Sequence, residues 1–164
     1  NKPGIWLERR GYAYLTSIMD LYFRKIISWV LSETLEASHV VKCIEKAKQS
    51  RHIENPLIFH CDRGCQYVSE AFHKATAGMI HSYSKKAYPW DNACIESFHA
   101  LLKREWINRF KIFNYTHAYK LIFEYIETFY NTVRIHSHCG YLSPNEYEEQ
   151  YLKNLETDVT NLES

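Results

Sequence analysis

The chain has 164 residues, of which 46% are hydrophobic and 24% charged, a composition typical of one globular domain with a sizeable core. Its 20 basic and 19 acidic residues give a net charge of +1, which argues against a protein that grips nucleic acid with its whole surface. No apolar stretch reaches the roughly 20 residues of a membrane span, and five irregularly spaced cysteines are typical of reduced thiols, so we expect a cytoplasmic protein without membrane association.

The first half of the chain predicts strands, then a helix, then another strand. Residues 11–31 contain two apolar, β-branched and aromatic runs, which predict two strands joined by a tight turn near Met19-Asp20-Leu21. Residues 35–49 have helical spacing of apolar side chains. After the break at Asn55-Pro56, the run Leu57-Ile58-Phe59-His60 is typical of a buried strand.

The second half is mainly helical. Ser69 is a candidate N-cap for a short helix, and residues 79–83 are a candidate strand. Asp91 or Asn92 can cap the next helix, whose predicted buried stripe consists of Ile95, Phe98, Leu102 and Trp106. Residues 116–133 form the clearest helix, and the aromatic side chains around it suggest burial on two sides and hence a dimer contact.

A final short helix is predicted to begin at Ser143-Pro144. The order of the elements predicts a mixed α/β layer domain. We assign residues 1–150 to this core and residues 151–164 to a C-terminal tail, with no apolar periodicity from Thr157 onward.

Two acids carry the chemistry that the sequence suggests. Asp62 directly follows an apolar strand, and side chains at the carboxyl ends of strands in open α/β sheets face a crevice. In that place an Asp can hold a hard cation, although a turn-capping Asp is the more common occurrence. Glu96 is predicted to project from a helix whose other face is buried. A lone helix Glu is usually solvated surface, so its weight comes from pairing with Asp62.

Four ordered segments resemble the integrase-core transposases of bacterial insertion sequences, which are relatives of retroviral integrase. The resemblance extends from about Gly11 to Tyr147. The segments are Met19-Asp20-Leu21-Tyr22-Phe23-Arg24-Lys25, His60-Cys61-Asp62-Arg63-Gly64-Cys65-Gln66-Tyr67-Val68-Ser69, Tyr88 to Phe98 with Leu102-Lys103-Arg104-Glu105, and Tyr130-Asn131 with Arg134-Ile135-His136 and Gly140 to Pro144.

This resemblance implies an RNase H-like fold, with a five-stranded mixed sheet flanked by helices and followed by C-terminal helices. It also implies an Asp-Asp-Glu triad that binds two Mg²⁺ or Mn²⁺ ions, with Asp62 as the second acid and Glu96 as the third. Two metals about 3.5–4 Å apart can stabilise the attacking and leaving oxygens of a phosphodiester. The implied partners are element-end and target DNA and further copies of the chain, in a homodimer or higher oligomer acting at the bacterial nucleoid.

The first acid of the triad is missing. The family has it on the opening strand, where this sequence has Asn1-Lys2-Pro3, and the nearby acids Glu8 and Asp20 are weak substitutes. We expect Asp20 to shape the turn between two strands. The first acid is therefore truncated, replaced or lost, and strand transfer is expected to be impaired. The alternative is a decayed core that only binds DNA or dimerises.

The remaining candidates are local basic patches and a zinc site. The side chains predicted to contact DNA, rather than to be ordinary solvated charges, are Arg63, Lys85, Lys86, Asn92, Lys103 and Arg104. Arg134 and His136 either contact DNA or tie down the last segment. Cys61 and Cys65 have the spacing of a zinc-ligand pair, but no second pair matches it, so structural zinc is the minor reading.

Overall fold

The computed structural model describes residues 4–8, 11–51, 57–61, 69–83 and 93–162. Its first sheet is antiparallel, in the order β1-β2-β3. These strands are β1 (Gly4–Leu7), β2 (Gly11–Met19) and β3 (Ile26–Ser32). The two strands predicted within residues 11–31 are confirmed, whereas β1, with only four residues, was not predicted.

A second, parallel sheet contains two short strands, β4 (Ile58–Cys61) and β5 (Ile80–Tyr83). Helix α2 (Glu70–Ala75) connects them, and the predicted cap is confirmed because the Ser69 hydroxyl accepts a hydrogen bond from the Phe72 amide. Within the described residues the five strands thus form two hydrogen-bonded sheets. One continuous five-stranded sheet is not confirmed, because β1 pairs only with β2 and β4 only with β5.

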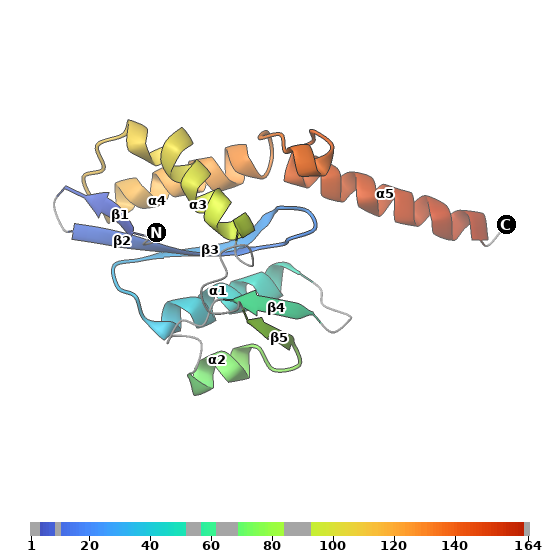
Figure 1. Ribbon diagram of the computed structural model, residues 1–164, viewed down its shortest axis with the longest axis horizontal. Helices are drawn as coiled ribbons and strands as arrows, with labels where there is room; N and C mark the ends of the chain where they lie inside the picture. Colours follow the sequence, from blue (N-terminus) through green and yellow to red (C-terminus); the bar gives the residue numbers. More distant parts are fainter. Residues whose placement is uncertain (1–3, 9–10, 52–56, 62–68, 84–92, 163–164) are drawn as a thin grey trace.

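Helices cover both faces of the three-stranded sheet (Figure 1). Helix α1 (Ala37–Ser50) lies on one face, together with the two-stranded sheet and α2. Helices α3 (Ala93–Glu105) and α4 (Tyr115–Phe123) lie on the other. Each side has its own apolar cluster: the larger joins β1, β2 and β3 to α3 and α4, and the smaller joins α1, β4 and α2.

The segment after α4 departs from the regular helix that the spacing predicts for residues 116–133. A π-helix, η4 (Glu124–Tyr130), continues directly from α4. Its wider turn is visible in the hydrogen bond from the Asn131 amide to the Ile126 carbonyl, at 3.1 Å. Tyr125, Ile126 and Tyr130 are buried in this π-helical segment.

The last helix is longer than predicted. After the 3₁₀ turns η3 (Ile107–Arg109) and η5 (Ser137–Cys139), α5 extends over Pro144–Leu162, 19 residues, and projects away from the body of the molecule (Figure 1). Ser143 begins it with a capping box, because its hydroxyl and amide both donate to the Glu146 carboxylate. None of the described helices is both long and apolar enough to cross a membrane.

Asn131 joins the helical side of the molecule to the sheet. Its side chain is buried and pairs with the main chain of Ile26 in β3: Oδ1 accepts from the amide and Nδ2 donates to the carbonyl, each at 3.0 Å. The Asn131 carbonyl in turn accepts from the Asn145 amide at the start of α5. One side chain therefore fixes the end of η4, the start of β3 and, through its own main chain, α5.

Replacing this side chain is expected to destabilise the fold. Asn131→Ala leaves the amide and carbonyl of Ile26 buried without these partners, so the free energy of unfolding should fall by about 2 to 3 kcal/mol. Urea unfolding followed by circular dichroism measures the change. Asn145→Ala is the matched control, since its Oδ1 is buried without a hydrogen-bond partner among the described residues. Equal losses in the two variants would contradict the role given to Asn131.

Candidate active site

Glu96 lies in the first turn of α3, and its side chain is exposed. The same helix is held to the sheet by Phe98 and Leu102, which are 1% and 2% exposed. His99 adds a polar contact, with its Nε2 3.2 Å from the Ser17 hydroxyl in β2. Glu96 therefore presents its carboxylate to solvent from a helix that cannot easily move, as a ligand for a cation requires.

The partner acid follows β4 in the sequence. Strand β4 ends at Cys61, and β4 and β5 are parallel, so their carboxyl ends meet at one edge of their sheet. Asp62 is the next residue, but it lies outside the described residues, as do Arg63, Lys85, Lys86 and Asn92. The shared cation between Asp62 and Glu96 stays a prediction.

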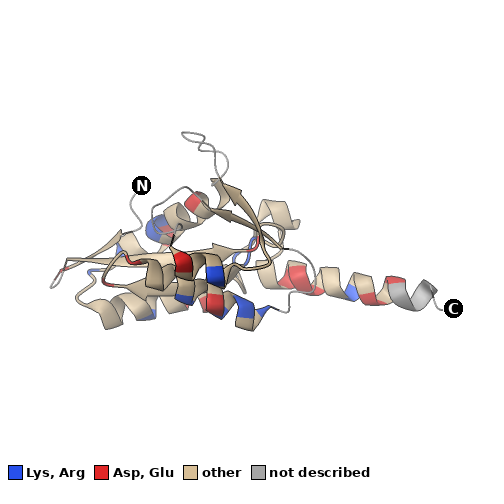
Figure 2. Cartoon of the chain, turned by 90° about the horizontal axis from the view of Figure 1, so that it is seen from below, with Lys and Arg blue, Asp and Glu red and all other residues tan. Residues whose placement is uncertain are grey.

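Two of the predicted DNA contacts are described, and both lie on α3. Lys103 is half-buried two helical turns after Glu96, on the same face, and Arg104 is exposed. Across the molecule, Lys and Arg are interspersed with Asp and Glu along the helices (Figure 2). The structure therefore has no extended basic surface among the described residues, and contact of Lys103 and Arg104 with DNA phosphates stays a prediction.

The environment of His99 keeps its imidazole neutral. Burial and, to a smaller extent, the nearby Lys103 ammonium together lower the pKa of His99 to about 4. A neutral ring can share a single proton with the Ser17 hydroxyl without placing a buried charge under the helix. This contact holds α3 in place next to Glu96.

The other end of α3 is fixed by a clamp. Arg134 donates two hydrogen bonds to the Glu105 carboxylate, from Nε at 2.9 Å and from Nη2 at 2.7 Å, and the Tyr125 hydroxyl donates a third at 2.7 Å. The hydrogen bonds from Arg134 lead the causes that hold the pKa of Glu105 below its usual range. The contacts of Arg134 therefore join the segment after η4 to the end of α3.

Comparisons with known proteins settle the family. A model of the integrase core domain family matches residues 5–89, and a second integrase core domain model matches residues 77–144. The chain belongs to the integrase core domain family. Its sequence is 38% identical over 143 residues to the transposase of insertion sequence element IS904 from Lactococcus lactis, covering 86% of this chain and 56% of that protein.

A second transposase, InsF of insertion sequence IS3A from Escherichia coli, is 35% identical over 144 residues, covering 87% of this chain and 50% of that protein. The chain thus spans about half the length of these relatives. Among solved structures, the catalytic core domain of BIV integrase superposes with a TM-score of 0.63 and 16% identity, covering 95% and 94% of the two chains.

A simian T-cell lymphotropic virus intasome in complex with the PP2A regulatory subunit B56 gamma also matches, with a TM-score of 0.70 and 14% identity over 90% of this chain and 51% of that one. The resemblance to insertion-sequence transposases and retroviral integrase is confirmed. At this level of identity the structural likeness establishes the fold of the integrase core, which is RNase H-like, as predicted.

Asp20 of this integrase core shapes a turn, as expected. Its Oδ1 accepts hydrogen bonds from the amides of Tyr22 and Phe23, at 2.9 and 3.1 Å. Its Oδ2 lies 3.6 Å from Arg51, at the end of α1. These contacts commit the carboxylate of Asp20 to the junction of β2 and β3.

The zinc reading gains no support from the described part of the integrase core. Nδ1 of His60 lies 2.9 Å from the Ser82 hydroxyl, and the His73 ring stacks on His81. Within that part, no three His, Cys, Asp or Glu side chains are grouped closely enough to hold a metal ion. Cys65 lies outside the described residues.

Acid is expected to destabilise this integrase core through His99. The pKa of His99 falls from its ordinary 6.5 to about 4 on folding, so between these values the unfolded chain binds more protons than the folded chain. The free energy of unfolding therefore decreases as the pH is lowered through this range. The slope is up to about 1.4 kcal/mol per pH unit. His99→Gln should flatten the curve of unfolding free energy between about pH 6.5 and about pH 5, whereas His73→Gln, at an exposed position, should leave it unchanged. Urea unfolding across this range checks both, and parallel curves for His99→Gln and the unaltered chain would refute the assignment.

Proposed function

We propose that this integrase core catalyses metal-dependent phosphoryl transfer on DNA, the strand-transfer step of transposition. The observation that carries the proposal is the exposed carboxylate of Glu96, at the matching place in the family segment, on a helix anchored by Phe98 and Leu102. The transposases that match the chain are named for insertion sequences, which supports DNA as the substrate.

The residues suit a hard cation. Mg²⁺ and Mn²⁺ prefer carboxylate oxygens, and Glu96 has no ion-pair partner among the described residues that would compete for its charge. Asp62 is the proposed second ligand. With two such ions bound, the attacking 3′-hydroxyl and the leaving oxygen of the phosphodiester are both stabilised. The chain itself supplies rigid placement of Glu96 and, in the proposal, phosphate contacts from Lys103 and Arg104, with Arg63, Lys85, Lys86 and Asn92 in the same role.

The missing first acid sets the level of activity. The family has its first Asp roughly nine residues before the residue that matches Gly11, and Asn1 or Lys2 in that position would be a poor or repulsive ligand for a divalent cation. We therefore expect impaired transfer. The same observation favours the alternative function, a decayed core that binds DNA or other copies of itself without chemistry.

Restoring the acid distinguishes the two functions. Lys2→Asp is expected to raise the rate of Mn²⁺-dependent joining of a labelled duplex end to a supercoiled plasmid by at least about a hundredfold. Loss of a single group that stabilises the charge of a transition state typically lowers a rate by about this factor. The double variant Lys2→Asp, Glu96→Gln should return to background. Because Glu96 is exposed, its replacement should change the unfolding free energy by less than about 0.5 kcal/mol. No joining by a folded Lys2→Asp protein would favour the decayed core.

A homodimer or higher oligomer belongs to the same proposal, as does action at the bacterial nucleoid. Helix α4 leaves Tyr119 and Phe123 exposed, at 43% and 45%, next to the half-buried ring of Tyr115. An aromatic surface of this kind favours a protein contact, and a second copy is the partner that we propose.

The oligomer is tested at the exposed aromatic side chains of α4. Phe123→Glu places a charge on the proposed contact and should shift the sedimentation coefficient to that of a monomer, while circular dichroism stays unchanged. Lys120→Glu, one turn away and with an exposed side chain, is the matched control. Monomeric behaviour of the unaltered chain at high concentration would exclude this contact.

A further inference from the structure

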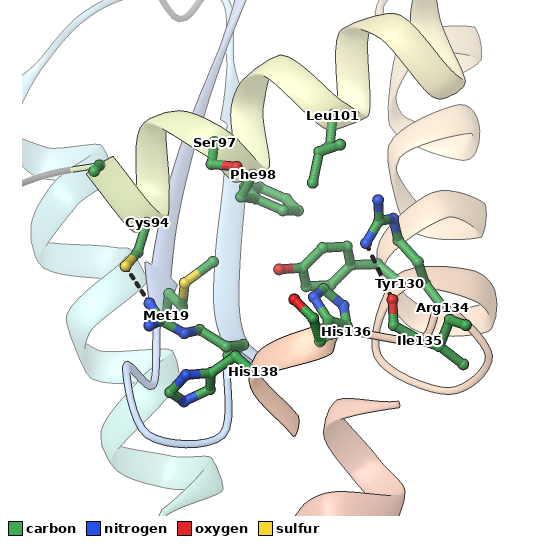
Figure 3. Close-up of a pocket in the computed structure, with 13 residues that line it drawn as sticks. Met19, Cys94, Ser97, Phe98, Leu101, Tyr130, Arg134, Ile135, His136 and His138 are labelled. Atoms are coloured by element: carbon green, nitrogen blue, oxygen red, sulfur yellow. Dashed lines mark hydrogen bonds between the residues drawn. The ribbon is translucent and has the colours of Figure 1, made fainter. Parts of the chain in front are cut away.

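A cavity of about 460 Å³ lies on a face of α3 that the proposed catalytic chemistry does not use. Its walls come from three parts of the chain: the N-terminal half of α3, the junction of β2 and β3, and the segment from Tyr130 to His138 (Figure 3). On α3, Ala93, Ser97 and Leu101 line it at a spacing of four residues. Glu96 lies on a different face of the helix, so the cavity is not the proposed metal site.

The cavity is cationic. Arg24 and Arg134 both line it, with His136 and His138, and among the described residues that line it none is Asp or Glu. The charge of Arg134 is largely matched by Glu105. Arg24 has no carboxylate within ion-pair distance among the described residues. Its guanidinium instead donates a hydrogen bond to the Cys94 thiol.

The backbone holds Arg24 in this place. Its φ of 57° is in the left-handed region, which a residue other than glycine adopts only when its surroundings require it. The junction supplies that requirement, because the Asp20 amide donates to the Lys25 carbonyl at 2.8 Å and the Asp20 carboxylate caps the amides of Tyr22 and Phe23. The turn between β2 and β3 thus directs an arginine that lacks a described carboxylate partner towards α3.

One polar atom of a residue that lines the cavity lacks a hydrogen-bond partner among the described residues. The Nε2 atom of His136 is buried without a hydrogen-bond partner among the described residues. Burial, followed by the charges of Arg134 and Arg24 among its causes, lowers the pKa of His136 to about 4. Both guanidiniums therefore project a positive potential onto the ring, and an anion in the cavity would reverse that effect.

We propose that this cavity binds a phosphate group of a nucleic-acid strand, at a place separate from the Asp62 and Glu96 centre. A phosphate has oxygens on several sides, and residues able to donate hydrogen bonds line the cavity from three parts of the chain: Arg24 at the strand junction, Ser97 on α3 and Ser137 in η5. The choice of nucleic acid over another phosphate source rests on the proposed function. A chain with a net charge of +1 needs such local contacts to hold DNA.

The first experiment asks whether the cavity takes phosphate at all. The unaltered chain is titrated with inorganic phosphate at constant ionic strength while the ring resonances of His136 and His138 are followed by NMR, with chloride as the reference anion. Saturable shifts of these resonances in the unaltered chain, reduced about tenfold in apparent affinity in Arg24→Asn, are expected. Asn tolerates the left-handed backbone of this position, so the variant should fold. Resonances that do not respond to phosphate would overturn the proposal.

The second experiment asks whether the phosphate belongs to a nucleic acid. Binding of a fluorescent DNA duplex is measured without divalent metal, over a range of salt concentrations, so an inactive catalytic centre does not affect the result. Arg24→Asn should weaken binding about tenfold and reduce the slope of log affinity against log salt by about one. Lys120→Gln, an exposed charge on α4, is the matched control and should change neither quantity comparably.

Two further outcomes would count against binding of a nucleic-acid phosphate, and a third separates this proposal from the catalytic one. Equal DNA affinities for Arg24→Asn and Lys120→Gln, with phosphate shifts present, would make the cavity a site for free phosphate or a mononucleotide. Shifts produced by polyglutamate but not by duplex DNA would assign the cavity to an acidic protein segment. Loss of strand transfer in a chain that still shows both expected effects would overturn the catalytic proposal alone.

Discussion

Burial of one face of α3 against the three-stranded sheet is the constraint on which the other features depend. Phe98 and Leu102 are almost completely removed from water, and burying two large apolar side chains contributes about 3 to 6 kcal/mol. The neutral His99 contact to Ser17 and the Glu105–Arg134 clamp then fix both the rotation and the far end of the helix. A helix held in this way can expose a carboxylate on one side and form a cavity wall on another without losing its position.

The polar residues of the family motifs differ in whether the fold already uses their polar groups. Glu96 is exposed, whereas three other motif residues form hydrogen bonds within the fold. Glu105 accepts from Arg134, and the side chain of Asn131 pairs with the main chain of Ile26. The buried amide of Asn131 is a substitute for a neighbouring strand, because it satisfies both main-chain groups of Ile26. Asp20 likewise caps a turn. The hydrogen bonds of these motif residues therefore give them a structural role in the fold.

How much of this could be predicted follows from the range of the forces involved. The strands in residues 11–31, the Ser69 cap and the buried stripe of α3 depend on local spacing and on short-range hydrogen bonds, and the sequence predicts them correctly. The four-residue β1 has too few residues for a pattern, and the local spacing does not distinguish the π-helix at Glu124–Tyr130 from a regular α-helix. The length of α5 was missed because residues 151–158 are exposed and have no buried face for the sequence to encode. Arg24 stands in a recognised segment, but nothing local indicates that its turn points it at α3.

Because the net charge of the chain is only +1, the positions of single cationic side chains matter for the proposed binding of DNA. Where basic and acidic side chains are interspersed, long-range attraction of a polyanion is weak and is screened within about 8 to 10 Å at physiological salt. Under the proposed function, affinity for DNA must then come from a few positions at which cations are held without a neutralising acid. Arg24, fixed by the strand junction over a cavity that none of the described acids lines, meets this condition, whereas Arg134 next to Glu105 does not. Because α3 contributes to this cavity on one face and carries Glu96 on another, a strand held by Arg24 and a strand under attack at Glu96 would have their relative positions set by the geometry of a single helix.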